Sequence, residues 1–142
     1  MLKITKAAFK QLVDACKREF PKEACGLIAG VKRSEDLFIK GAFPLRNVTN
    51  SPFIYETDAE EVYNASISME KLGLNALGIY HSHPFSRAEP SELDKRTAFH
   101  PSMIYVIVSL MEDVADVRAY LWNGEKFINC PISVEMDREQ ED

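Results

Sequence analysis

The stretch His81-Ser82-His83-Pro84, followed after six residues by Ser91-Glu92-Leu93-Asp94, joins the end of an extended segment to the start of a helix. Side chains two positions apart on a strand point to the same side, so His81 and His83 can reach one ion. Asp94 comes eleven positions after His83 and can return as a third ligand from the next element. Three nitrogen and oxygen ligands leave the fourth tetrahedral position to water, as in catalytic zinc sites. We therefore expect one zinc ion per chain, held by His81, His83 and Asp94.

These residues also have simpler interpretations. The two histidines can be ordinary residues at a strand end, although the chain contains only one other, His100. His100 precedes a proline at a predicted helix end, where its charge would favour the helix dipole, so we do not expect it to bind the ion. Ser91 and Asp94 match a capping box, in which Ser91 satisfies free backbone N–H groups. Seen alone, the Ser-x-x-Asp pattern favours a helix start over a metal ligand.

Around this stretch the sequence predicts a mixture of helices and strands. The predicted helices span 6–20, 58–72 and 91–99, and the predicted strands span 24–31, 37–43, 76–83, 103–110, 114–122 and 126–129. On the strand at 76–83, alternation places Leu77, Ile79, His81 and His83 on one face. Asn123-Gly124 predicts a type I′ turn between the last two strands. This order of elements indicates a single α/β domain with a mixed sheet.

A second stretch, Pro21-Lys22-Glu23-Ala24-Cys25-Gly26-Leu27, precedes the first of these strands. The spacing H-x-H-P-x(6)-S-x(2)-D resembles the metal motif of the JAMM (MPN-plus) metalloprotease family, and a glutamate before Cys-Gly-Leu resembles its other signature. The likeness runs from about Thr5 to near Val134. It implies a JAMM/MPN-like α/β fold, a mixed curved β-sheet packed against helices. We expect residues 1–136 to form the catalytic domain and 137–142 an acidic flexible tail.

The resemblance also implies roles for individual residues. Glu23 would act as general base, holding the attacking water and taking its proton, and Ser91 would stabilise the oxyanion. Without the resemblance, Glu23 would be read as a solvated glutamate after a proline turn. Cys25 lies two residues from Glu23, but it forms no recognisable Cys/His nucleophile pattern with the rest of the chain.

The substrate that the resemblance implies is a ubiquitin-like β-grasp protein, cut after its C-terminal Gly-Gly by an isopeptidase. This compact chain looks closer to the prokaryotic branch of the family, whose alternative reaction releases a cysteine or small amine from a sulfur-carrier protein. Phe53, Tyr55 and Phe85 are candidates for the wall of the substrate channel, although each can equally be ordinary packing. A non-catalytic scaffold is a further alternative, and it disagrees with the presence of every expected ligand.

The bulk composition sets limits on the other classes of function. The chain has 142 residues and a net charge of −5 without a basic cluster, which argues against a nucleic-acid partner. No signal sequence is evident, and no window reaches the roughly 18 apolar residues of a membrane span. Three cysteines without close pairing fit a reducing cytoplasm, although the redox state of Cys130 stays open. A homodimer is compatible with the sequence.

Overall fold

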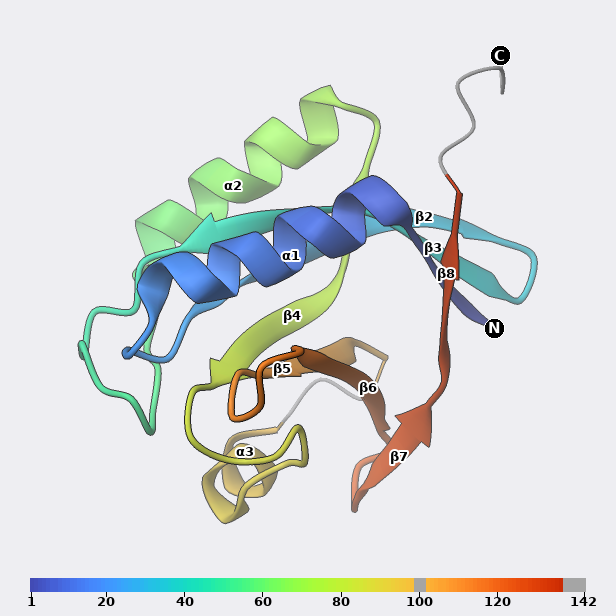
Figure 1. Ribbon diagram of the computed structural model, residues 1–142. Helices are drawn as coiled ribbons and strands as arrows, with labels where there is room; N and C mark the ends of the chain where they lie inside the picture. Colours follow the sequence, from blue (N-terminus) through green and yellow to red (C-terminus); the bar gives the residue numbers. More distant parts are fainter. Residues whose placement is uncertain (99–101, 137–142) are drawn as a thin grey trace.

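The computed structural model describes residues 1–98 and 102–136 (Figure 1). The elements, in chain order, are β1 (Leu2–Thr5), α1 (Lys6–Glu19), β2 (Cys25–Arg33), β3 (Asp36–Leu45), α2 (Ala59–Lys71), β4 (Asn75–His83), α3 (Glu92–Thr97), β5 (Ile104–Ser109), β6 (Asp116–Trp122), β7 (Phe127–Cys130) and β8 (Ile132–Glu135). The predicted tail at 137–142 and His100 lie outside the described residues. Within them, no helix is both long enough and apolar enough to cross a lipid bilayer.

The eight strands form one sheet in the order β7-β6-β5-β4-β2-β3-β1-β8. The pairs β4–β5, β1–β3 and β1–β8 are parallel and the others are antiparallel, so the predicted mixed sheet is confirmed. β7 and β8 lie at opposite edges of the sheet, yet only Pro131 separates them in the chain. The sheet must therefore curve until its two edges approach each other, as Figure 1 shows.

The helices cover both faces of this sheet. Side chains alternate along β2, so Ile28 packs in a core cluster with Leu12 of α1, whereas Leu27 packs with Met69 of α2 on the opposite face. α3 lies apart from both, beyond the end of β4 (Figure 1). Thr5 is the N-cap of α1, because its Oγ1 accepts a hydrogen bond from the Ala8 N–H at 3.1 Å.

Two short strands were absent from the sequence prediction. β1 and β8 have four residues each and pair with one another, and β1 also pairs with β3. Four residues show too little alternation of apolar and polar side chains to distinguish a strand from an irregular segment before a helix or at a chain end. β1 buries Leu2 and Ile4 in the α1 cluster, and it delivers Thr5 directly to the start of that helix.

Three local predictions were wrong or incomplete. Leu77 does not share a face with Ile79, because the β2–β4 register shifts at this point and Leu77 packs in the α1 cluster instead. The hairpin after β6 exists, but its turn has four residues between Trp122 and Phe127 rather than two. Asn123 Oδ1 stabilises this longer turn by accepting hydrogen bonds from the N–H groups of Glu125 and Lys126. α3 ends at Thr97, short of the predicted Phe99, which lies outside the described residues.

Candidate metal and active site

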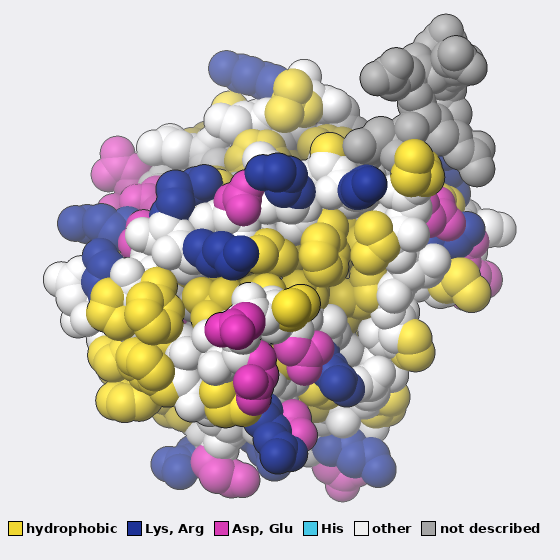
Figure 2. All heavy atoms as spheres, in the orientation of Figure 1, with side chains coloured by type: hydrophobic (Ala, Val, Ile, Leu, Met, Phe, Trp, Pro, Cys, Tyr) yellow, Lys and Arg dark blue, Asp and Glu magenta, His cyan; other side chains and the backbone are white. Residues whose placement is uncertain are grey.

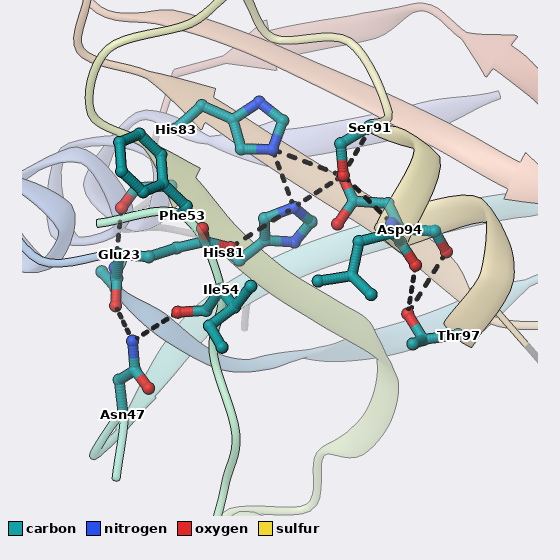
Figure 3. Close-up of polar contacts among 12 residues, drawn as sticks. Glu23, Asn47, Phe53, Ile54, His81, His83, Ser91, Asp94 and Thr97 are labelled. Atoms are coloured by element: carbon teal, nitrogen blue, oxygen red, sulfur yellow. Dashed lines mark hydrogen bonds and ion pairs between the residues drawn. The ribbon is translucent and has the colours of Figure 1, made fainter. Parts of the chain in front are cut away.

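His81 and His83 lie at the C-terminal end of β4, and their side chains are 3% and 7% exposed. Their Nε2 atoms are 3.2 Å apart, and Asp94 Oδ2 lies 3.2 Å from the first and 3.3 Å from the second (Figure 3). Ligand atoms bonded at about 2.0–2.1 Å to a tetrahedral zinc ion lie about 3.3–3.4 Å apart. The three atoms therefore have the spacing of one face of such a site, so the residues present fit the ion.

Asp94 reaches the histidines because it opens α3. Ser91 is the N-cap: its Oγ accepts from the Asp94 N–H at 3.0 Å, and its own N–H donates to Asp94 Oδ2 at 2.8 Å. The capping box that the sequence suggested is therefore present. The same carboxylate oxygen faces both imidazoles, so capping does not exclude metal binding. Because Ser91 Oγ accepts the capping bond, its hydroxyl hydrogen can still point toward a substrate.

The two histidines are oriented in different ways. His83 Nδ1 lies 2.7 Å from the Arg87 carbonyl oxygen. Donation from Nδ1 to this carbonyl leaves the Nε2 lone pair for an ion, which is the usual arrangement of a histidine ligand. His81 Nδ1 is buried and has no hydrogen-bond partner among the described residues. Instead, the ring of Tyr55 stacks on the His81 imidazole, with centroids 4.9 Å apart and planes inclined by 24°.

Glu23 completes a buried group with the two histidines, close enough together to hold a metal ion. Its Oε1 lies 3.9 Å from His81 Nε2, farther than Asp94 Oδ2. The interpretation of Glu23 as a solvated glutamate is wrong, because the residue is 2% exposed. Burial raises the pKa of its carboxyl to about 8, although the nearby charge of His83 opposes the shift. A carboxylate in this environment is a stronger base than one in water.

In Asp94 and His83, unlike Glu23, hydrogen bonds outweigh burial in setting the direction of the pKa shift. Burial would raise the pKa of Asp94, but its hydrogen bonds with His81 and His83 outweigh burial and hold the pKa well below its usual range. Burial lowers the pKa of His83, whereas the hydrogen bonds to Asp94 and to the Arg87 carbonyl raise it, with a net rise. The hydrogen bonds to the histidines therefore favour the ionised form of Asp94, which is the form that binds a metal ion.

Sequence analysis missed two residues that hold this arrangement together. Ser82 is fully buried, and its Oγ accepts from the Ala24 N–H at 2.7 Å while its N–H donates to the Ala24 carbonyl at 3.0 Å. Asn47 Nδ2 donates to the Glu23 carbonyl at 2.9 Å. The position of Ser82 between the histidines was a usable signal. Asn47 gave none, because an asparagine in a polar loop is typical of any turn.

A cavity of about 480 Å³ opens onto the site. Glu23, His81 and Asp94 form its polar end, and its remaining lining is mostly apolar, including Leu27, Leu45, Ile79, Met103, Tyr105 and Phe127. Of the predicted channel residues, Phe53 and Tyr55 line this cavity. The two differ in exposure, since Phe53 is 74% exposed whereas Tyr55 is largely buried against His81.

Phe85 is not among the residues that line the cavity. Its ring packs edge-on against Phe20 at the end of α1, with centroids 5.5 Å apart, and about half of each residue is exposed. Figure 2 shows exposed hydrophobic side chains gathered where the C-terminal end of α1 and the loop between β3 and α2 lie in Figure 1. The structure therefore brings Glu23, His81, His83, Ser91 and Asp94 together and places Phe85 on the adjoining surface.

Comparison with known proteins agrees with this fold. The family described as prokaryotic homologs of the JAB domain matches residues 5–123. The chain is 35% identical over 116 residues to a desampylase from Haloferax volcanii, a match covering 81% of this chain and 80% of that protein. It is also 35% identical over 98 residues to a CysO-cysteine peptidase from Mycobacterium tuberculosis, covering 69% and 66% of the two chains.

A solved structure has the same fold. The solution structure of protein DSY2949 from Desulfitobacterium hafniense has a TM-score of 0.90 and 32% sequence identity, and the match covers 99% of this chain and 97% of that one. The family match spans residues 5–123, most of the chain, and the match to the Haloferax volcanii protein covers 81% of it. The chain therefore belongs to the family of prokaryotic JAB-domain proteins.

Proposed function

We propose that the chain is a zinc-dependent hydrolase that cleaves the amide bond after the C-terminal Gly-Gly of a ubiquitin-like, β-grasp modifier. The observation that carries the proposal is the triangle of His81 Nε2, His83 Nε2 and Asp94 Oδ2, with a buried carboxylate, Glu23, beside it. Family membership supports it, as do relatives named desampylase and CysO-cysteine peptidase.

In this proposal His81, His83 and Asp94 hold the ion. A zinc ion bound by them would lower the pKa of water to about 7 and polarise the scissile carbonyl. Glu23 accepts the proton of the attacking water and passes it to the leaving nitrogen, so no covalent intermediate with the enzyme is required. Ser91 donates its hydroxyl hydrogen to the oxyanion that develops on the carbonyl oxygen.

The cavity beside the histidines is consistent with a substrate tail that is extended and narrow at the cut bond. A pair of glycines carries no side chain, so it can approach the histidines between Tyr55 and α3, while the larger residues before it face the apolar cavity. A tail bound in this way would be held mainly by its main chain, as in other strand-like peptide complexes.

A second candidate reaction uses the same residues. In this alternative, the chain removes a cysteine or another small amine from the C-terminal glycine of a sulfur-carrier protein. The relative named CysO-cysteine peptidase favours it. The two candidates differ only in the group on the nitrogen side of the cut bond, so they can be separated by the choice of substrate.

The test compares two substrates with one enzyme preparation. One is a ubiquitin-like protein joined through its terminal glycine to a lysine side chain of a second protein, and the other is the same protein carrying a C-terminal cysteine adduct. Preferential cleavage of the first supports the isopeptidase, and preferential cleavage of the second supports the sulfur-carrier reaction. If zinc-loaded enzyme cleaves neither substrate, the proposed function is wrong.

Replacing Ser91 by alanine is expected to lower kcat about 10²–10³-fold, because a single oxyanion donor typically contributes that much. The same change removes the N-cap of α3, which typically costs about 1 kcal/mol of stability. Ser91→Gly separates the two effects, because glycine caps a helix almost as well as serine but has no hydroxyl. Equal loss of kcat in both variants, at equal zinc content, indicates the oxyanion role, whereas wild-type kcat in Ser91→Gly would exclude it.

A further inference from the structure

Asn47 lies in the loop between β3 and α2, and it is 2% exposed. Its Nδ2 donates to the carbonyl oxygens of Glu23 and Ile54, each at 2.9 Å, with a longer contact of 3.4 Å to the Ser51 carbonyl (Figure 3). Burying a side-chain amide is costly unless its hydrogen bonds are made, as they are here. A buried network in which every group is bonded holds the segments that it joins in fixed positions. Here the two segments that it joins, at Glu23 and at Ile54, both line the cavity of the candidate site.

The acceptor end of the same side chain shapes the loop itself. Asn47 Oδ1 accepts from the Thr49 N–H at 3.0 Å, the Thr49 hydroxyl at 2.7 Å and the Glu56 N–H at 3.2 Å. These bonds span residues 49–56, which include Phe53 and Tyr55 on the cavity wall. The donor and acceptor ends of Asn47 therefore have separable tasks.

The donor end holds the backbone of Glu23. This residue precedes β2, which begins at Cys25, so its backbone groups lie outside the ladder of the sheet. Its N–H donates to the Ser51 carbonyl at 2.8 Å, and its carbonyl accepts from Asn47. Both backbone groups of Glu23 thus form hydrogen bonds with the loop that contains Asn47. The next residue, Ala24, is hydrogen-bonded to Ser82 of β4.

The other bond from Nδ2 reaches the cavity wall. It binds the carbonyl of Ile54, directly between Phe53 and Tyr55. The ring of Tyr55 stacks on His81, whose Nδ1 has no hydrogen-bond partner in the described part of the chain. A displacement of this loop would therefore reach the imidazole of His81 as well as the backbone of Glu23.

We propose that Asn47 is a positioning residue, which couples Glu23 to the loop that carries Phe53 and Tyr55. The general base and this part of the cavity wall would then keep a fixed position relative to each other. The proposal rests on the proposed function for its kinetic consequence, but the coupling itself is a property of the protein alone. Without the Nδ2 bonds, the Glu23 carbonyl loses its partner, and its N–H keeps only a Ser51 carbonyl in a loop that Asn47 no longer ties to Glu23.

The kinetic test uses Asn47→Ala and Asn47→Asp, assayed on the cleavable conjugate well below each variant's melting temperature and normalised to bound zinc. Asp has the shape of Asn and keeps the acceptor, but it cannot donate to Glu23. We expect both variants to lose kcat by on the order of 10²-fold, as misplacement of a catalytic group by about 1 Å typically costs. Zinc content should stay near one per chain, because no proposed ligand is touched.

Thr49→Val serves as the matched control. It removes the hydroxyl bonds to Asn47 Oδ1, to the Ile54 carbonyl and from the Ser51 N–H, and so loosens the loop without touching the Nδ2 bond to the Glu23 carbonyl. We expect this variant to raise KM and to leave kcat close to that of wild type. A wild-type kcat in Asn47→Ala or Asn47→Asp, with only a lower melting temperature, would show that Asn47 stabilises the fold and does nothing more.

Amide hydrogen exchange tests the coupling without any substrate, so its result stands even if the proposed function fails. In Asn47→Asp we expect faster exchange at the Glu23 amide and across 50–56 together, with the amides of β5 unchanged. In Thr49→Val only the loop should exchange faster. If the Glu23 amide keeps its protection while the loop of Asn47→Asp opens, the two segments are not coupled through Asn47 and the proposal is overturned.

Discussion

Glu23→Gln is expected to abolish hydrolysis while zinc remains bound at one ion per chain. Glutamine has the size of glutamate and can hold a water by a hydrogen bond, but its amide cannot accept the proton that must leave that water. General base catalysis typically contributes about 10²–10⁴ in rate, so the loss should be at least of this order. The measurement is kcat for the variant and wild type on one conjugate, with metal content determined on the same samples.

Zinc content decides between two roles for this residue. Glu23 lies close enough to both histidines to belong to a metal-binding group, but its carboxylate is 3.9 Å from His81 Nε2, compared with 3.2 Å for Asp94. A base should leave the metal in place when replaced, whereas a ligand should release it. Glu19→Gln, the same chemical change at the exposed end of α1, controls for a general effect of losing a carboxylate. Activity retained in Glu23→Gln would remove Glu23 from the mechanism.

His83→Ala is expected to lose zinc and activity while the protein stays folded. The substitution removes one of the three atoms of the triangle, and the remaining pair cannot form a tetrahedral site with three protein ligands. The fold should survive because the core clusters on both faces of the sheet do not depend on His83, and single substitutions typically cost about 0.5–3 kcal/mol. Metal analysis, circular dichroism and the conjugate assay on one preparation check the three parts.

Phe85→Ala is the matched control for this variant. Phe85 is two residues farther along the chain, in the loop after β4, and packs against Phe20, so its loss should leave the zinc content unchanged. Unfolding of His83→Ala, or of the wild type on chelation, would instead indicate a structural metal whose binding energy is folding energy.

The sequence predicted the site best where two of its residues, His81 and His83, lie on a single strand. The spacing of His81 and His83 placed both on one side of β4, and this held because the register of β4 with β5 is regular over these residues. The same alternation failed at Leu77, where a register shift with β2 that no local pattern announces turns the side chain to the other face. Periodicity predicts direction only within an unbroken ladder.

Long-range contacts explain the rest of what the sequence could not predict. Asp94 was a candidate from its spacing, but its distance to the imidazoles depends on how the loop after Pro84 returns α3 to β4. Asn47 and Ser82 act by bonding to residues 23 and 24, far away in the chain. The place of Ser82 between the two histidines could have singled it out, whereas neither hydrophobic pattern nor spacing points to Asn47. The strands β1 and β8 likewise form through pairing with segments far away in the chain, because β1 pairs with β3 and β8 pairs with β1.

We propose that amide hydrolysis by this chain depends on one zinc ion held by His81, His83 and Asp94. It is tested most directly by titrating zinc into metal-free wild-type protein and measuring cleavage of the ubiquitin-like conjugate at each step. We predict no cleavage without metal, a rise in rate with each addition and saturation at one equivalent of zinc. Cleavage by the metal-free protein, or saturating zinc binding that brings no cleavage of either substrate, would contradict the account.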